Sequence, residues 1–476
     1  MAIRRSLAGT SDAPSSTDNH HSPSAAQLAK AGTMLTVLAN RTYRHLLAAQ
    51  LIALIGTGLA TVALGLLAYD LAGGNAGAVL GTALAIKMVA YIGVAPVVGA
   101  FADRLPRRAF LVSMDLVRAA VALCLPFVDQ IWQIYVLIFV LQSASAAFTP
   151  TFQATIPDVL PAEADYTRAL SLSRLAYDME SLASPILAAG LLTVISFHWL
   201  FAGTAIGFLA SAMFVLSVVL PQSPAKARAG GIYAKTTRGL RIYLKTPRLR
   251  GLLALSLASA AASSMVIVNT VVIVRSMLGL GQREVALTLA TYGGGSMLAA
   301  LVVPRLLDTI SDRAMMVGAA TVLTIGLGAM ATIFALGAVH WQFVLAGWFA
   351  LGVAYSMSVT PSGRLLRRSA NAEDRPAVFA AQFALSHGCW LIAYPVAGQV
   401  GAVLGQTAAF AALAVLAGIG TLAAITIWPT RDPALVAHRH DDLPADHPHL
   451  RESHDAEEGH AFVIDDLHGA WPRSAG

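Results

Sequence analysis

Charged residues and cysteines are both scarce in this chain. Only 12% of its 476 residues are charged, whereas soluble domains carry about a quarter. The two cysteines, Cys124 and Cys389, lie inside apolar runs, so they offer neither a disulfide framework nor a metal-ligand spacing. A phosphate-binding Gly-Lys-Ser/Thr loop is also missing, so ATP-driven work is not encoded here. We therefore expect no enzymatic activity and no cofactor.

Apolar residues, in contrast, are abundant and arranged in long runs. They make up 56% of the chain, whose mean hydropathy is +0.66. A helix needs about 20 apolar residues to cross a bilayer, and twelve runs come close to or exceed that length. These runs lie at about 46–69, 79–101, 109–128, 132–156, 168–196, 199–220, 250–275, 285–307, 314–337, 341–363, 376–402 and 406–428. The pattern predicts an all-α membrane protein with twelve transmembrane helices.

Polar segments divide these runs into two groups of six. The central segment, Pro221 to Arg250, mixes apolar and basic residues and is either an interfacial helix on anionic lipid or a solvated linker. The Ser- and His-rich start of the chain indicates a disordered tail that needs no signal peptide. The predicted units are an N-terminal tail at 1–43, a bundle at 44–220, a linker at 221–249, a bundle at 250–430 and a His/Asp-rich tail at 431–476.

Basic residues are distributed very unequally over the two predicted sides of the membrane. Of the 32 Lys and Arg residues, only Arg275 and Arg283 fall on one side, and Lys87, Arg118 and Arg174 fall inside runs. All others lie on the side that carries both tails. The positive-inside rule then places both termini in the cytoplasm of a protein of the inner (plasma) membrane. The net charge of +6 has this origin, and we expect no nucleic-acid partner.

A short connector between the second and third runs carries a distinctive motif. It reads Gly99-Ala100-Phe101-Ala102-Asp103-Arg104-Leu105-Pro106-Arg107-Arg108. The order Gly-x-x-x-Asp-Arg-x-x-Arg-Arg resembles the signature loop of the major facilitator superfamily, which usually has Gly in place of Pro106. The resemblance implies two six-helix bundles around a central cavity that opens alternately to each side. It also implies the gate residues Gly99, Asp103, Arg104, Arg107 and Arg108.

The two halves repeat some of the same signals. The connector from Arg305 to Arg313 is a weaker version of the signature loop. Thr149-Pro150-Thr151, near the end of the fourth run, is echoed by Thr360-Pro361-Ser362 near the end of the tenth. Related six-helix halves are what the resemblance implies, because the halves of this superfamily are parallel repeats.

Seven ionisable residues lie inside the apolar runs, where they are costly and usually mark function. They are Lys87, Asp115, Arg118, Arg174, Asp178, Glu180 and His387. Asp115 and Arg118 are three residues apart on one helical face, so we expect them to pair with each other or with the loop charges. Lys87 either snorkels to the surface or binds a ligand. His387 is either a buried structural histidine or a functional one.

The fifth run contains the densest group of these charges. Arg174 and Asp178 are four residues apart and can form an ion pair. Glu180 lies about 200° further round the helix than Asp178, so it has no partner on its own helix. Both acids lie about ten residues or more, or roughly 15–18 Å, from the cytoplasmic end of the run. We therefore expect Glu180 to carry a proton, with Asp178 as a structural partner or as the alternative carrier.

The resemblance is strongest to the drug, macrolide and siderophore exporter branch. Ser184-Pro185-Ile186-Leu187-Ala188-Ala189-Gly190 resembles a motif in helix five of proton-coupled exporters, although Ser184 and Ala188 stand where the family has Gly. The resemblance implies a small-molecule substrate moved against proton re-entry, with Asp103 bracing the start of helix eleven. That start is marked by Asn371, Glu373 and Asp374 before Arg375-Pro376.

The C-terminal tail leaves two other functions open. It holds seven of the thirteen histidines, interleaved with acids, as in nickel- and cobalt-exporting members of the superfamily. We name His438, His440, His447 and His449 as candidate metal ligands, although their spacing defines no coordination geometry. A solvated acidic tail is the alternative reading. The remaining alternative function is a membrane sensor or scaffold that transports nothing.

Overall fold

The computed structural model describes residues 36–101, 106–220, 232–371, 374–430, 462–465 and 467–471. Twelve long helices in this described part coincide with the twelve expected runs. The first six are α2 (Arg41–Ala72), α3 (Ala76–Phe101), α4 (Arg107–Cys124), α5 (Ile131–Val159), α6 (Glu163–Leu191) and α7 (His198–Leu216). The second six are α9 (Pro247–Val272), α10 (Gln282–Leu306), α11 (Asp312–Ala335), α12 (Trp341–Val359), α14 (Arg375–Pro395) and α16 (Gln406–Ile427). The predicted all-α fold is confirmed.

Length and composition qualify most of these helices as membrane spans. Ten stretches of the described residues are long and apolar enough, and the first of them, residues 41–94, runs through both α2 and α3. The long helix missing from that set is α6, whose sequence carries Arg168, Arg174, Asp178 and Glu180. Large apolar side chains such as Ile206, Met213, Val415 and Leu422 are exposed on the outer helices, as expected where lipid is the solvent.

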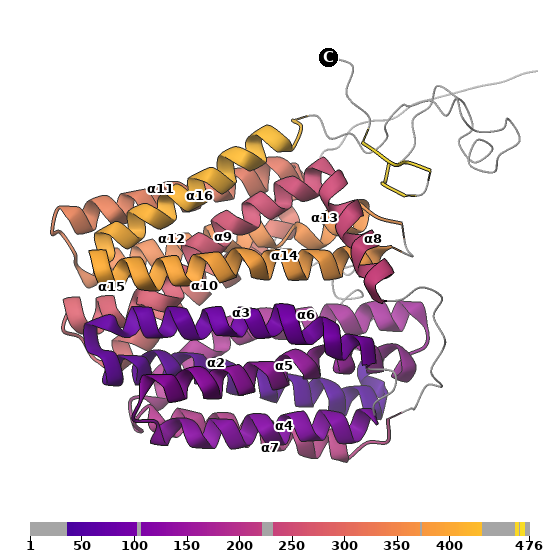
Figure 1. The fold of residues 1–476 in the computed structure, drawn as a ribbon, viewed down its shortest axis with the longest axis horizontal. Helices are drawn as coiled ribbons and strands as arrows, with labels where there is room; N and C mark the ends of the chain where they lie inside the picture. Colours follow the sequence, from indigo (N-terminus) through magenta and orange to yellow (C-terminus); the bar gives the residue numbers. More distant parts are fainter. Residues whose placement is uncertain are drawn as a thin grey trace, which may run out of the picture.

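The helices form two stacked bundles, one from each half of the chain (Figure 1). In this view α2 to α7 lie in the lower layer, and the helices from α9 to α16 lie in the upper one. The halves meet where α3 packs on α14 and where α6 packs on α10. At Gly81 of α3 the backbones come very close, because a Cβ atom there would lie 2.6 Å from the carbonyl oxygen of Tyr394. Glycine is what allows this approach.

The central polar segment contains a helix, α8 (Ile232–Lys245), that packs on α14 and α9. Its Ile242 and Tyr243 are fully buried. Arg238 forms a two-pronged ion pair with Asp374 at the start of α14, with Nε to Oδ1 at 2.6 Å and Nη2 to Oδ2 at 3.0 Å. Ile242 and Tyr243 of this segment therefore contact protein, whereas Leu240 and Leu244 of the same helix are exposed, so the interfacial and solvated interpretations both stay predictions. We call the end of the molecule that carries α8 the linker end (Figure 1).

The last described residues, 462–465 and 467–471, dock at the linker end. Phe462 and Ile464 are buried, and Arg248 donates to the carbonyl oxygen of Phe462 at 3.3 Å while its guanidinium lies 4.9 Å from the Trp471 ring centroid. Arg248, counted with the linker in the sequence, is in fact a buried residue of α9. His468 is also buried, and its Nδ1 is 2.9 Å from Oδ1 of Asp465.

The linker end shows the same construction in both halves. In the first half, Arg107 at the start of α4 pairs with Asp158 near the end of α5. In the second half, Asp312 at the start of α11 pairs with Arg364 of α13 (Ser362–Arg368), with Nε to Oδ1 at 3.0 Å and the charges exchanged.

The neighbouring arginine also has matched partners. Arg108 donates to the carbonyl oxygen of Leu216 at the end of α7, and Arg313 donates to that of Trp428, which follows α16, at 2.9 Å. A carbonyl at a helix end lacks an intrahelical partner, so an arginine there satisfies it. The two connectors, which echo each other in sequence, therefore hold equivalent helix ends.

Candidate functional site

Two opposite charges on different helices, Lys87 and Glu180, interact inside the first bundle. Lys87 is eleven residues into α3 and fourteen residues from its end, so it lies roughly 17–21 Å from either terminus of that helix. Glu180, near the middle of α6, interacts electrostatically with Lys87. Neither side chain is exposed. Glu180, expected to have no partner on its own helix, therefore interacts with a cation on another helix.

The position of Glu180 depends on close packing between α6 and α2. Ser184, one turn after Glu180, is fully buried, and its hydroxyl lies 3.5 Å from the carbonyl oxygen of Ile55. A Cβ atom on Gly58 of α2 would lie 2.8 Å from Oε1 of Glu180. Pro185 is accommodated inside α6 without ending it. The small-residue and proline motif noted in the sequence therefore packs α6 closely on α2 beside the carboxylate.

An aromatic stack connects this pair to the second bundle. The ring of His387 on α14 lies parallel to that of Tyr91 on α3, with centroids 5.4 Å apart and an interplanar angle of 9°. Nδ1 of His387 is 2.7 Å from the carbonyl oxygen of Phe383, whose ring is 4.0 Å away. The ammonium of Lys87 is 5.9 Å from the Tyr91 centroid, at the limit of a cation–π contact. One histidine of the second half thus meets the charged pair of the first.

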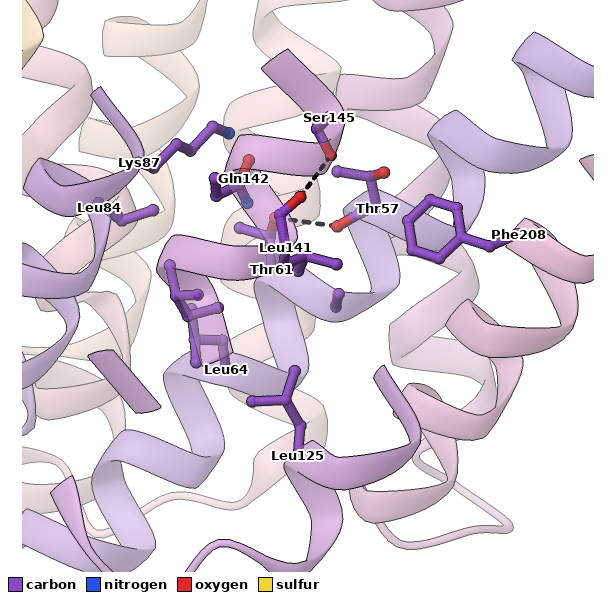
Figure 2. A pocket seen from close by; sticks show the side chains of 12 residues that line it. Thr57, Thr61, Leu64, Leu84, Lys87, Leu125, Leu141, Gln142, Ser145 and Phe208 are labelled. Atoms are coloured by element: carbon purple, nitrogen blue, oxygen red, sulfur yellow. Dashed lines mark hydrogen bonds between the residues drawn. The ribbon is translucent and has the colours of Figure 1, made fainter. Parts of the chain in front are cut away.

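A small cavity of about 20 Å³ lies beside Lys87, between α2, α3, α5 and α7 (Figure 2). Its polar lining comes from four uncharged residues and one cation, and apolar side chains complete the wall. The polar residues are Thr57, Thr61, Lys87, Gln142 and Ser145. The hydroxyls of Thr57, Thr61 and Ser145 donate to carbonyl oxygens four residues earlier in their own helices, at 2.9–3.0 Å.

The predicted pair of Asp115 and Arg118 is confirmed. Both are buried, and Ser211 of α7 donates to Oδ2 of Asp115 at 2.8 Å. The guanidinium of Arg118 lies 4.3 Å from the ring centroid of Phe148 and 4.5 Å from that of Phe208. Because the two charges neutralise each other and Asp115 also accepts a hydrogen bond from α7, this pair fits a structural role.

The gate motif is only partly covered by the described residues. Asp103 and Arg104 lie outside them, and for Gly99 only the helical backbone of α3 is described. Arg107 and Arg108 make the linker-end contacts given above. Asp374, which marks the start of α14, pairs with Arg238 of α8, and the predicted brace by Asp103 falls outside the described residues.

Several other predicted residues also lie outside the description. The side chains of Arg174 and Asp178 are among them, although α6 itself is described. The candidate metal ligands His438, His440, His447 and His449 are outside it too. Among the described residues there is no cluster of three or more His, Cys, Asp or Glu side chains placed to hold a metal ion.

At the end opposite the linker end, the two halves are in direct contact. Ser276 of the π-helical turn Ile273–Met277 donates to the Tyr69 hydroxyl of α2 at 3.3 Å, and Arg275 lies over the Tyr69 ring at 5.1 Å. Gln399 donates to the Thr82 hydroxyl of α3 at 3.2 Å. The halves therefore meet at this end as well as beside the charged pair.

Sequence reasoning missed several residues of this region. Tyr91, Gln142 and Asp158 each carry no local pattern, since aromatic and amide side chains in apolar runs are common. Asp158 was detectable in principle, because an acid at the end of the fourth run can face the arginines of the signature loop. Tyr91 and Gln142 become notable only when α14 and Lys87 are placed beside them.

Comparison with protein families matches the Major Facilitator Superfamily over residues 46–319 and 252–445. A curated relative is the uncharacterized MFS-type transporter YfiS of Bacillus subtilis (strain 168). It is 24% identical over 297 residues, which cover 60% of this chain and 69% of YfiS.

Solved transporter structures share the fold. The nucleoside transporter NupG aligns with a TM-score of 0.67 at 12% identity, covering 82% of this chain and 100% of NupG. A bacterial homologue of the human lysosomal transporter Spinster gives 0.63 at 12% identity, covering 81% of this chain and 98% of that one. The D-xylose-proton symporter gives 0.60 at 16% identity, covering 82% and 96%. At such identities the likeness establishes the fold alone.

Proposed function

We propose, from the premise that this chain belongs to the Major Facilitator Superfamily and is a multi-pass membrane transporter, that it is a proton-coupled exporter. Its cargo would be a small drug-like or siderophore-like molecule, moved by alternating access across the inner membrane with both termini in the cytoplasm. The observation that carries this proposal is the electrostatic interaction between Glu180 of α6 and Lys87 of α3 inside the first bundle, beside the stack with His387.

Glu180 is the residue that we assign to proton coupling. It is a carboxylate far from either helix end, with one counter-charge on another helix. In a medium of low dielectric constant the attraction between two such charges is strong, so adding a proton to Glu180 changes the energy of the pair substantially. A proton can therefore decide which arrangement of α3 and α6 is favoured.

The site also lies where the two halves would move against each other. The inter-half contacts are made by α3 with α14 and by α6 with α10, and Lys87 and Glu180 sit on α3 and α6. His387 extends the site onto α14. Superfamily transporters rock one half against the other around a site near the bilayer middle. A change of charge at Glu180 would therefore act on α3 and α6, the helices at which the halves would move during transport.

The proposed direction rests on α6. Its Ser184-Pro185 segment packs α6 on α2 beside Glu180, as the exporter-type motif requires of small residues. The linker-end arginines, which would face the cytoplasm under the positive-inside rule, support the orientation.

The test uses purified protein in liposomes that are acidified inside and contain a pH-sensitive dye. Addition of a transported compound from a panel of drugs and siderophores should raise the internal pH, because protons leave as the compound enters. Glu180→Gln should abolish this signal while the compound still shifts the thermal unfolding temperature. A compound that moves without any proton flux would refute proton coupling.

The two alternatives predict different outcomes in the same preparation. A nickel or cobalt exporter should lose metal flux when residues 431–476 are removed, because the candidate ligands lie in that tail. A sensor or scaffold should show no flux for any compound, although ligand binding remains detectable.

A further inference from the structure

We propose that the cavity lined by Thr57, Thr61, Gln142 and Ser145 is a hydrated second site for the ammonium group of Lys87. Lys87 would move toward it when Glu180 takes up a proton. This inference rests on the proposed role of Glu180, and it adds a site and a set of positioning residues to it. It assigns the cavity a definite occupant, namely water together with the lysine ammonium.

The size of the cavity suits this occupant. Its volume of about 20 Å³ exceeds the roughly 10–15 Å³ that a single internal water requires. A drug-sized molecule needs a pocket of several hundred Å³. The cavity is therefore too small for the transported compound, and its contents must be water or a single small group.

The chemistry of the lining selects for hydrogen-bond donors. The hydroxyl protons of Thr57, Thr61 and Ser145 are already used by backbone carbonyl oxygens of their own helices. Each hydroxyl oxygen therefore has only lone pairs left to offer. An ammonium group has three donors and no acceptor, and water can also donate twice. The donors of the lining are limited to the Gln142 amide and to the Lys87 ammonium itself.

Gln142 offers the cavity an amide that can bind water. Its side chain is only 9% exposed, and the hydrogen bonds recorded for the described residues include none from its amide. The amide lines the cavity, so a water there can donate to its oxygen and accept from its nitrogen. In Figure 2 the amide lies in the same region of the cavity as the ammonium end of Lys87.

Lys87 is the one charged residue of the lining, and it faces titratable groups on other sides. Glu180 approaches from α6, Tyr91 lies one turn further along α3, and His387 lies across the bundle interface on α14. From α2, α5 and α7, the cavity lining contributes uncharged residues only. The side chain of Lys87 is long and flexible, so its ammonium group can reach either the acid or the acceptor-lined cavity.

The movement follows from charge balance. When Glu180 is ionised, its carboxylate attracts the ammonium, and the pair is neutral overall. When a proton neutralises Glu180, that attraction is lost, while the ammonium still requires solvation. The oxygens of Thr57, Thr61, Gln142 and Ser145, with one or two waters, provide it. Lys87 keeps its proton throughout, so one proton is bound at Glu180 and none is released.

Water-edited solid-state NMR on full-length protein in lipid bilayers tests this directly. Lys87 is one of only five lysines, so its Cε signal in lysine-labelled protein can be assigned by its loss in Lys87→Met. The measured quantity is the rate at which magnetisation passes from water to Lys87 Cε, at one fixed pH. Glu180→Gln, which imitates the protonated acid, should raise this rate several-fold over that of the wild type.

A second substitution in the Glu180→Gln background decides whether the cavity is responsible. Gln142→Leu removes the amide and should return the rate to the wild-type value. Thr151→Val is the control, because Thr151 is a buried polar residue of the same helix, α5, but does not line the cavity. It should leave the raised rate unchanged.

Two results would overturn the proposal. One is an unchanged rate in Glu180→Gln, and the other is a raised rate that persists after Gln142→Leu. Neither depends on knowing the transported compound, so failure here is separate from failure of proton coupling in the liposome assay. If the NMR result holds but Glu180→Gln retains full coupling, the cavity stands and the proposed role of Glu180 is wrong.

Discussion

The carboxylate of Glu180 lies against Gly58 of the neighbouring helix. A Cβ atom on Gly58 would come within 2.8 Å of Oε1 of Glu180, and Ser184 occupies the adjoining space. The absence of a side chain at one residue of α2 therefore permits the placement of an acid on α6.

This contact predicts the effect of Gly58→Ala. The added methyl group must displace Glu180, Ser184 or both, and overpacking of this kind costs about 1–3 kcal/mol. We expect a lower unfolding temperature and reduced transport driven by a pH gradient. Gly190→Ala on α6 is the control, because a Cβ atom there meets nothing within 4 Å. Wild-type behaviour of Gly58→Ala in both assays would contradict the described packing.

The two acids of α6 should respond differently to loss of charge. Glu180→Gln removes the counter-charge of Lys87, so we expect transport to become independent of the pH gradient while exchange of substrate continues. Asp178→Asn leaves Arg174 without its predicted partner four residues later in the helix, so we expect less folded protein. Transport in inverted vesicles, normalised to protein amount, separates the two effects. If only Asp178→Asn loses coupling, Asp178 and not Glu180 is the proton carrier.

The buried pair on α4 should matter for folding rather than for coupling. Arg118→Leu leaves Asp115 buried without its cation, and breaking a buried pair costs about 3–5 kcal/mol. We expect little folded protein, and a normal ratio of protons to substrate in what remains. The double variant Asp115→Asn with Arg118→Leu should recover part of the yield, since no buried charge is then unpaired. A changed proton ratio would instead point to a functional pair.

The ion pair between Arg238 and Asp374 predicts coupling between the linker helix and α14. Asp374→Asn removes the charge that holds α8 at the start of α14. The two hydrogen bonds from Arg238 to this carboxylate are 2.6 and 3.0 Å long. Because Arg238 is partly exposed, we expect a small loss of stability but faster hydrogen exchange in α8. Hydrogen-exchange mass spectrometry measures this, with Arg241→Ala on the same helix for comparison. Equal exchange in Asp374→Asn and wild type would show that the pair does not hold α8.

The docked C-terminal segment predicts a dependence on pH. Burial tends to raise the pKa of Asp465, but hydrogen bonds from His468 and from the Leu467 amide, with the charge of His468, outweigh it and lower that pKa. Because the pKa of Asp465 is lower when the segment is docked, the ionised carboxylate stabilises docking at pH values above the ordinary aspartate pKa, near 4. This stabilisation is lost as the pH falls through the lowered pKa.

Asp465→Asn should reproduce the effect of acid at neutral pH. We expect the bond after Phe462 to be cut faster by chymotrypsin at pH 7.5 in this variant than in the wild type. Arg248→Lys, which keeps the charge but not the stacking on Trp471, should behave similarly. Protection that is unaffected by either substitution would mean that other contacts retain the segment.

The sequence by itself determined which parts of the chain are helices and in what order. Apolar length sets each span, because a bilayer core leaves no water for unpaired backbone groups. It also predicted the pair of Asp115 and Arg118, since residues three apart on a helix are neighbours whatever surrounds them. The equivalence of the connectors at Arg108 and Arg313 was visible as a repeat.

Only the tertiary structure decided what the charges meet. Lys87 and Glu180 are far apart in the chain, and their encounter depends on how α3 and α6 are rotated and how closely Gly58 lets α2 approach α6. Gln142 acquires meaning only because its amide lines a cavity beside Lys87. Helix period and hydropathy restrict neighbours within one helix, whereas contacts between helices follow from packing of whole faces.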